Sequence, residues 1–314
     1  MEIKDFGKVG VLMGGPSSER EISLKSGKAV LSVLKESGVD ALGIDITTDN
    51  IQDNIRLINS YNLNCAFIAL HGRFGEDGAI QDILEQLNLV YTGSGVKASR
   101  LAMDKIGSLS VFKAGDLYVP RSQFLESTSF NKNINFKNTL GFPLVVKPAN
   151  HGSSIGLSII ELEQEIPAAI QLAFKFDQRI IIEEYISGRE LTVGVLDERP
   201  LAVIEIVPKH KFFDFEAKYQ VGLTDYIIPA HLSLEIAENV QQAALKAHKL
   251  LGCFGCSRTD IILNHDNLPY VLEINTIPGM TATSLLPKAA KISGIDFNHL
   301  CIKLLELAYE KAKV

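Results

Sequence analysis

The sequence lacks three features by which common classes of protein are recognised. No apolar run approaches the ~20 residues needed to span a membrane, and the opening residues MEIKDFGKVGVLMGG lack the apolar core of a signal peptide. An excess of positive charge is also missing, because 31 Lys and Arg stand against 37 Asp and Glu, for a net charge of -6. We therefore expect a cytoplasmic protein with neither a membrane nor a nucleic-acid partner.

Cysteine is scarce, with four residues in the chain, and this fits a reducing compartment. Cys65 and Cys301 lie in apolar segments and are expected in the core. Cys253 and Cys256 form a C-x-x-C pair, but the sequence offers no second pair of metal ligands at a suitable spacing. We expect these two cysteines to be packing residues beside a turn.

The common nucleotide-binding fingerprints are also absent or weak. The segment SGKA lacks the upstream glycine and the hydroxyl residue of a P-loop. The segment GSGVKA matches G-x-G-x-x-A, but it follows a late strand, and no acidic residue ends a strand about 20 residues further on. A nicotinamide cofactor is therefore not expected.

The chain has 314 residues, which is too long for a single hydrophobic core. Residues 1–96 alternate continuous apolar strands with amphipathic helices, which predicts a doubly wound parallel sheet. Residues 97–182 predict a small α+β domain with hairpin-like strand pairs, and the segment VKASRLAMDKIGSLSVFKAGD at its start is predicted to be helical. Residues 183–314 predict a further α+β domain that ends in a helix.

A loop of small residues, KPANHGSSIG, follows a predicted strand and begins with Lys147. Small residues let backbone N–H groups approach an anion closely, and a lysine adds positive charge. The loop therefore suits a phosphate group, although an ordinary polar turn would have the same composition.

The segment PYVLEIN places Glu273 and Asn275 two residues apart, on one face of a predicted strand. Asp260 lies on the preceding strand, which a short turn joins to this one as a hairpin. Two carboxylates and an amide on one patch are the hard oxygen donors that Mg²⁺ prefers. The alternative is a salt-bridged hairpin that uses Arg258 and nearby lysines. The turn TIPGMT that follows would bring backbone amides close to the metal.

Two further residues lie where ligands commonly bind. Glu19 is predicted at a helix N-terminus, where a capping acid that compensates the helix dipole is the alternative. His71 is predicted at the carboxyl end of a strand, where open parallel sheets bind ligands, although a lone histidine there is often structural.

Taken together, these motifs resemble the ATP-grasp superfamily and, within it, the D-alanine–D-alanine ligases. The resemblance rests on an ordered set of segments that spans nearly the whole chain, and no single motif would decide it. The segments are GGPSSEREISL, HGRFGEDG, YTGSG, MDK, VKPANHGSSIG, EEYISGRELTV, FDFEAKY, RTDIIL and EINTIPGMTATSL.

The resemblance implies an ATP-grasp fold in which an N-terminal doubly wound parallel-sheet domain accompanies two α+β domains that sandwich ATP. It also implies a reaction: ATP phosphorylates the carboxylate of one D-alanine, and the amine of a second attacks the acyl phosphate. The dipeptide would serve peptidoglycan precursor synthesis. Two Mg²⁺ ions, for which Mn²⁺ is a possible substitute, and a homodimer belong to the same expectation.

The resemblance also assigns roles to individual residues. It places Asp260, Glu273 and Asn275 on the two metal ions. It places the nucleotide against a set that serves phosphates, adenine and ribose, namely Lys105, Lys147, Lys218, Gly152, Ser153, Ser154, Glu183, Glu184, Tyr185, Ile186 and Glu190. Glu184 stands where many relatives have lysine, and Ile277 stands where serine is common.

The substrates are assigned in the same way. Glu19 would hold the ammonium group of the first D-alanine, with His71 nearby. Arg258 and the Gly279 amide would stabilise the tetrahedral oxyanion. Ser284 and Leu285 would position the carboxylate of the second D-alanine. Tyr219 would cap the site through contacts with Glu19 and Ser153. A tyrosine at this last position favours dipeptide over depsipeptide synthesis.

Two other functions stay open at this point. One is another ATP-grasp ligase that joins a different carboxylate and amine, and the other is a non-enzymatic nucleotide-binding module. Release of phosphate from ATP, with and without D-alanine, would distinguish them.

Overall fold

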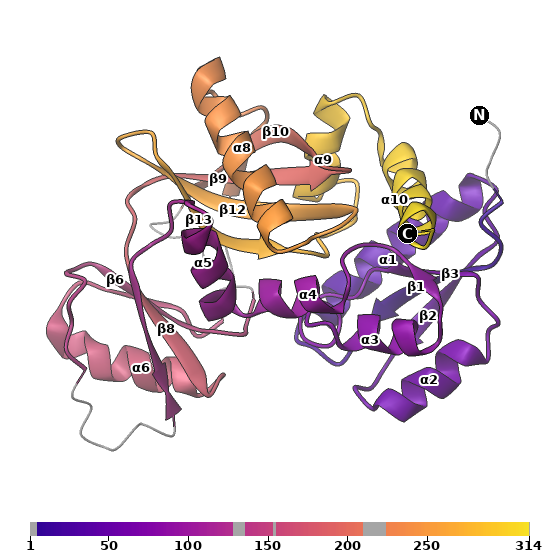
Figure 1. Ribbon diagram of the computed structural model, residues 1–314, viewed down its shortest axis with the longest axis horizontal. Helices are drawn as coiled ribbons and strands as arrows, with labels where there is room; N and C mark the ends of the chain where they lie inside the picture. Colours follow the sequence, from indigo (N-terminus) through magenta and orange to yellow (C-terminus); the bar gives the residue numbers. More distant parts are fainter. Residues whose placement is uncertain (1–4, 128–135, 153–154, 210–223, 314) are drawn as a thin grey trace.

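The structure is a computed structural model that describes residues 5–127, 136–152, 155–209 and 224–313 (Figure 1). Four predicted site residues therefore lie outside the described residues, namely Ser153, Ser154, Lys218 and Tyr219. Within the described ranges, no helix is both long and apolar enough to cross a bilayer.

The first sheet is parallel and has the strand order β2-β1-β3-β4, as the apolar strands predict. The strand β1 is buried along its whole length because helices cover both faces. The sequence analysis did not predict helix α2, which is capped by Asn50, whose side chain accepts a hydrogen bond from the Asp53 N–H. The elements are β1 (Val9–Gly14), α1 (Arg20–Glu36), β2 (Ala41–Ile46), α2 (Ile51–Asn59), β3 (Cys65–Ile68), α3 (Ala79–Gln86) and β4 (Val90–Tyr91).

The segment predicted to be helical after the first sheet is interrupted. The helix α4 (Val96–Met103) ends before Asp104, whose backbone is extended, and α5 (Lys105–Ala114) begins directly after it. The Asp104 side chain accepts hydrogen bonds from the N–H groups of Ile106 and Gly107. Aspartate is among the strongest N-cap residues, so Asp104 ends one helix and starts the next.

The second sheet is antiparallel, with the strand order β5-β8-β6-β7. It packs against α6 around its own apolar cluster, which includes Leu144, Ile170 and Ile182. In Figure 1 this sheet and α6 form a separate lobe below α5. The elements are β5 (Ser122–Glu126), β6 (Leu144–Pro148), β7 (Ser158–Ile160), the 3-10 helix η2 (Glu163–Glu165), α6 (Ile166–Phe174) and β8 (Arg179–Glu184).

The third sheet is also antiparallel, with the order β11-β10-β9-β12-β13. The predicted hairpin of β12 and β13 is confirmed, and it pairs Asp260 with Glu273 and Arg258 with Asn275. The elements are β9 (Gly188–Leu196), β10 (Arg199–Pro208), β11 (Thr224–Ile227), α8 (Leu234–Leu250), β12 (Cys256–Asn264), β13 (Pro269–Asn275), α9 (Leu285–Ile292) and α10 (Phe297–Lys311).

The C-terminal helix α10 returns to the first sheet and packs against α1 and β4 (Figure 1). Its buried residues Leu300 and Leu304 share one apolar cluster with Val11 of β1 and Val30 of α1. The same cluster includes Leu286 of α9, which packs against β9 and β10. The first and third sheets are therefore joined by one continuous hydrophobic core.

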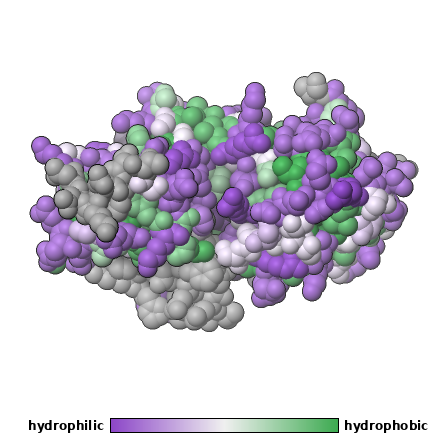
Figure 2. Space-filling view, turned by 90° about the horizontal axis from the view of Figure 1, so that it is seen from below, coloured by the Kyte–Doolittle hydropathy of each residue, from purple (hydrophilic) through white to green (hydrophobic). Residues whose placement is uncertain are grey.

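The outer surface carries mostly hydrophilic residues on the face that Figure 2 shows. Hydrophobic residues appear there in groups between hydrophilic ones, over the described part of the chain. The exposed face therefore has the mixed composition expected of a protein in water.

The four cysteines generate a test of the packing. All four thiols are free and buried, and burial raises the pKa of Cys65, Cys253 and Cys256 to about 12 each. Only a thiolate reacts with a disulfide reagent, so at pH 8 the native protein should react negligibly over minutes. Four equivalents should react after denaturation. Rapid reaction of one thiol in the native protein would contradict the burial.

Candidate active site

A cavity of about 390 Å³ lies where α1, the start of α5, the β12–β13 hairpin and the loop before α9 meet. It gathers residues that the sequence analysis assigned to metal, phosphate and both substrates, although they lie up to 266 residues apart in the chain, from 19 to 285. The predicted residues that line it are Glu19, His71, Lys105, Gly152, Arg258, Asp260, Glu273, Asn275, Gly279, Ser284 and Leu285.

The predicted metal patch lies on one face of the β12–β13 hairpin. Asp260 and Glu273 are directly opposite each other across the two strands. Asp260 accepts hydrogen bonds from the Thr192 hydroxyl at 2.7 Å and from Arg258 at 3.0 and 3.1 Å. These are the ion pairs of the salt-bridged alternative, and they occupy the same face as the predicted ligands. The metal assignment stays a prediction.

Lys105 connects this patch to the glycine loop. Its ammonium nitrogen lies 3.3 Å from the Glu273 carboxylate and donates a hydrogen bond of 2.6 Å to the His151 carbonyl oxygen. The lysine is only 6% exposed, and Gly152 lines the cavity next to His151. A buried cation between a carboxylate and a loop of small residues is well placed to meet a phosphate.

The loop that follows β13 is folded on itself by short contacts. The Asn275 side chain accepts a hydrogen bond of 2.8 Å from the Ile277 N–H. The Ser284 hydroxyl lies 2.8 Å from the Thr281 hydroxyl, and a Cβ at Gly279 would lie 3.1 Å from the Ser284 oxygen. Glycine therefore gives the loop its close approach at this point, and the Gly279 backbone faces the cavity region.

His71 positions the same loop with both ring nitrogens. Its Nδ1 lies 3.1 Å from the Ile277 carbonyl oxygen, which can only accept, so Nδ1 carries the proton. Its Nδ1 also lies 3.4 Å from the Glu76 carboxylate. Its Nε2 lies 2.9 Å from the Ser26 hydroxyl, whose oxygen accepts from the Met280 N–H at 3.2 Å. His71 therefore contacts the loop on both sides of Gly279.

Two carboxylates, Glu19 and Glu76, face the cavity from the segments before α1 and after β3. Glu19 begins α1 but forms no capping hydrogen bond with that helix, and a Cβ at Gly72 would lie 2.6 Å from its Oε2. Burial raises the pKa of Glu76, the hydrogen bond from His71 opposes this, and the charge of Glu19 adds to the increase. The two acids therefore make this end of the cavity attractive to a cation.

A second predicted cation, Lys147, forms an ion pair with Glu183 outside the lining of this cavity. Its ammonium nitrogen lies 2.7 Å from a Glu183 oxygen, and both residues are buried. Burial lowers the pKa of Lys147, but the carboxylates of Glu183 and Glu273 outweigh it and raise the pKa overall. The other Glu183 oxygen, Oε1, is buried without a hydrogen-bond partner in the described part of the chain. An amino group of a ligand would satisfy that acceptor.

The rest of the predicted adenine and ribose set lies on β8, after it, and on β9. The Glu184 carboxylate is turned to Arg121, whose Nε donates at 2.6 Å, and the Tyr185 N–H donates to the Pro143 carbonyl oxygen. Glu190 lies on β9 opposite Ile262 of β12. These residues and Ile186 do not line the 390 Å³ cavity.

Several residues of the cavity were not predicted. Glu76 lies inside the segment HGRFGEDG, so the signal was present in the sequence but was not interpreted. Ser26 lies on the inner face of α1, one turn from residues that were noticed only as apolar positions. Thr281 lies inside the segment EINTIPGMTATSL and was likewise not interpreted, whereas Tyr226 lies in none of the quoted segments.

Comparisons with known proteins agree with this geometry. The family model "D-ala D-ala ligase C-terminus" matches residues 111–306, and "D-ala D-ala ligase N-terminus" matches residues 49–94. The D-alanine--D-alanine ligase of Geotalea uraniireducens (strain Rf4) is 47% identical over 96% of this chain and 95% of its own length. That of Nitrosomonas eutropha is 44% identical over 99% of this chain and 100% of its own length.

The solved structures point the same way. The crystal structure of D-alanine--D-alanine ligase from Bacillus anthracis complexed with ATP superposes with a TM-score of 0.85 at 33% identity, over 98% of each chain. Three sheets that converge on a cavity rich in lysine and carboxylate groups therefore define an enzyme of the ATP-grasp class. Within that class, the chain belongs to the D-alanine–D-alanine ligase family.

The raised pKa of Glu76 predicts a pH-dependent stability. Below the ordinary pKa of 4.5, the Glu76 carboxyl is protonated in both the folded and the unfolded state and does not lower the free energy of unfolding. As pH rises through the higher pKa of the folded state, the free energy of unfolding falls. Glu76→Gln stays neutral throughout, so it should raise the free energy of unfolding relative to the wild type at pH 8 and not at pH 4. Urea unfolding at both values measures this. An equal effect at the two values would contradict a buried, ionised Glu76.

Proposed function

We infer that this enzyme joins two D-alanine molecules to D-alanyl-D-alanine, with conversion of ATP to ADP and phosphate. The observation that carries the inference is the cavity, which has a carboxylate pair at one wall, a lysine–carboxylate pair in the middle and the Gly279 loop at the other side. Such a site binds an amino acid and a phosphate donor together. The dipeptide is a building block for peptidoglycan precursors.

The first D-alanine binds through its ammonium group at the wall formed by Glu19 and Glu76. A charge-assisted hydrogen bond to a carboxylate is the strongest contact that this wall can offer. The cation also offsets the charge of Glu19, which adds to the effect of burial in raising the pKa of Glu76. L-alanine presents the same ammonium, so selection between enantiomers depends on the placement of the methyl and carboxylate groups.

ATP lies between the second and third sheets. Lys105 and Lys147 neutralise the phosphates, and Gly152 opens the loop for close approach of the backbone. The adenine amino group donates to Glu183 Oε1, which has no partner in the described part of the chain. The backbone from Glu184 to Ile186 lies along the edge of the base. Glu190 takes the ribose hydroxyls. Ser153, Ser154 and Lys218 complete the phosphate site.

The donor set suits Mg²⁺. Asp260 and Glu273 face each other with Asn275 on the same side, and their charges are already balanced by Arg258 and Lys105. Two carboxylates and an amide fit a hard divalent cation that shares its coordination with phosphate. When bound, Mg²⁺ would neutralise charge on the transferring phosphoryl group. Two ions are proposed for the site.

The second half-reaction uses the other side of the cavity. Arg258 and the Gly279 N–H stabilise the oxyanion that forms when the second D-alanine attacks the acyl phosphate. Ser284 and Leu285, at the start of α9, hold the carboxylate of the attacking D-alanine. Tyr219 closes the site over Glu19, and it favours an amine over a hydroxyl as nucleophile.

Three broader features belong to the same proposal. Domain boundaries at 1–96, 97–182 and 183–314 are supported by the location of one sheet in each range, although β8 extends to Glu184. A cytoplasmic location is supported by four free cysteines and by the need for ATP. A homodimer is supported by the family resemblance.

A product assay tests the proposed function. Purified enzyme with ATP, Mg²⁺ and D-alanine should release phosphate and form D-alanyl-D-alanine, identified by mass spectrometry. Release should stop without D-alanine, and L-alanine should not replace it. Phosphate release that does not depend on D-alanine, or a different product, would contradict the proposal.

A single substitution tests the metal site. Glu273→Gln keeps the size of the side chain but removes a charge that balances Lys105 and that would hold Mg²⁺. We expect turnover to fall by at least about a hundredfold at saturating Mg²⁺, since preorganised electrostatic contacts are often worth that much. Thermal unfolding should change little. A variant with near-wild-type kcat and lowered stability would favour the salt-bridged hairpin instead.

A further inference from the structure

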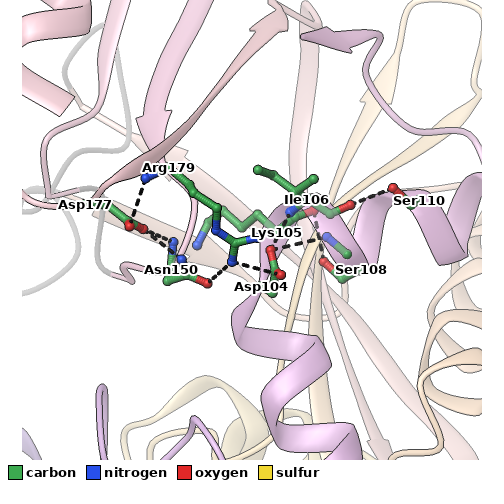
Figure 3. A network of polar contacts seen from close by, with 9 residues as sticks. Asp104, Lys105, Ile106, Ser108, Ser110, Asn150, Asp177 and Arg179 are labelled. Carbon is green, nitrogen blue, oxygen red and sulfur yellow. Dashed lines mark hydrogen bonds and ion pairs between the residues drawn. The ribbon is translucent and has the colours of Figure 1, made fainter. Parts of the chain in front are cut away.

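A polar network lies beside Lys105, between the start of α5 and the second sheet (Figure 3). We call it the Arg179 network, and it consists of Asp104, Asn150, Asp177 and Arg179. Arg179 begins β8, and its Nη2 donates to Asp104 Oδ2 at 3.0 Å and to Asn150 Oδ1 at 3.2 Å. One guanidinium nitrogen therefore connects the start of α5 to the segment that follows β6, the neighbour of β8 in the second sheet.

Asp104 divides its two carboxylate oxygens between two tasks. Its Oδ1 accepts from the N–H groups of Ile106 and Gly107, which starts α5, while Oδ2 accepts from Arg179. The rotation of this carboxyl group is therefore fixed at both oxygens. Because Lys105 follows Asp104 directly, the direction in which the Lys105 side chain leaves the backbone is fixed with it.

Asn150 is held as firmly as Asp104. Its backbone N–H and its side-chain Nδ2 both donate to Asp177 Oδ2, at 2.7 and 2.9 Å. The other Asp177 oxygen accepts from the Arg179 N–H at 3.1 Å. Asn150 is the residue before His151 and Gly152, so the network anchors the base of the glycine loop.

Lys105 touches this anchored segment twice. Its backbone N–H donates to the Ala149 carbonyl oxygen at 3.1 Å, and its ammonium donates to the His151 carbonyl oxygen at 2.6 Å. Ala149 in turn donates to the Arg179 carbonyl oxygen at 2.9 Å. The lysine, the loop and β8 therefore share one set of hydrogen bonds.

The geometry points to Arg179 as a positioning residue for the phosphate site: through Asp104 and Asn150 it sets Lys105 and the glycine loop in the arrangement that receives ATP. This inference rests on the proposed function. Arg179 itself does not line the 390 Å³ cavity. It lines a separate cavity of about 830 Å³ together with Asp104 and Asn150. In this inference its effect reaches the nucleotide through the residues that it holds.

A purely structural brace is the competing explanation. The Arg179 and Asp104 side chains are 38% and 27% exposed, and an ion pair of that exposure adds little to folding stability. If the ion pair only stabilised the fold, its removal would lower the melting temperature and leave the kinetic constants unchanged. A positioning residue would change the handling of ATP and leave the binding of D-alanine unchanged.

Steady-state kinetics with three variants separate the two. Arg179→Met should lower kcat/KM for ATP roughly tenfold, the loss of about one charge-assisted hydrogen bond, with the KM for D-alanine within twofold. Asp104→Asn keeps the Oδ1 cap but removes the charge, and it should show a similar loss for ATP. Arg179→Lys keeps the charge with a less suitable geometry and should lie between the wild type and Arg179→Met.

The double variant Arg179→Met with Asp104→Asn distinguishes positioning from charge balance. If the pair acts as one unit, the double variant should lose no more than either single variant. Recovery of the wild-type kcat/KM for ATP would mean that Arg179 only cancels the charge of Asp104, and it would overturn the inference.

A matched control comes from an ion pair of similar length and exposure away from the cavity. Lys303 and Asp197 lie 2.9 Å apart and are 33% and 42% exposed. Lys303→Met should leave kcat/KM for ATP within twofold. An equal loss in both methionine variants, or a lower melting temperature of Arg179→Met with unchanged kinetics, would overturn the positioning role. Failure of the wild type itself to form the dipeptide would instead contradict the proposed function.

Discussion

The position of the Lys105 ammonium group is the constraint on which the rest of the site depends. It contacts the Glu273 carboxylate of the third sheet and the His151 carbonyl oxygen of the second sheet, and it projects from the first turn of α5. Three parts of the fold therefore meet at one buried cation. A cation in that position is stable only while an acceptor from each side stays in place, since an unpaired buried charge costs several kcal/mol.

Three carboxylates in or near the cavity are paired in advance of any ligand. Asp260 is held by Arg258 and Thr192, Glu273 by Lys105, and Glu183 by Lys147. Such pairs add little net stability, but they fix the direction of each carboxylate. In the proposed function, Mg²⁺ would take Asp260 and Glu273, the phosphates would take the lysines, and Glu183 Oε1 would accept from the adenine amino group. The site can then bind highly charged ligands with little reorganisation, which is the condition for effective electrostatic catalysis.

The sequence predicted the parts of the site that local periodicity controls. Residues two apart in a strand share a face, so Glu273 and Asn275 were placed together, and the short turn placed Asp260 opposite. The interruption at Asp104 was not predicted, because apolar spacing continues through it and only the side-chain cap reveals the break. The packing of α10 against α1 depends on a contact between chain ends nearly 300 residues apart, which no local pattern encodes.

His71 shows how far such long-range contacts reach into the chemistry. The sequence suggested that it lies near the first substrate, and it does line the cavity, but both of its ring nitrogens contact protein groups. Nδ1 holds the Ile277 carbonyl oxygen, and Nε2 acts through Ser26 on the Met280 N–H, so the two bonds bracket Gly279. The Gly279 amide, which is proposed to support the oxyanion, is therefore held between two contacts of a histidine that follows the first sheet and lies 206 residues before Ile277.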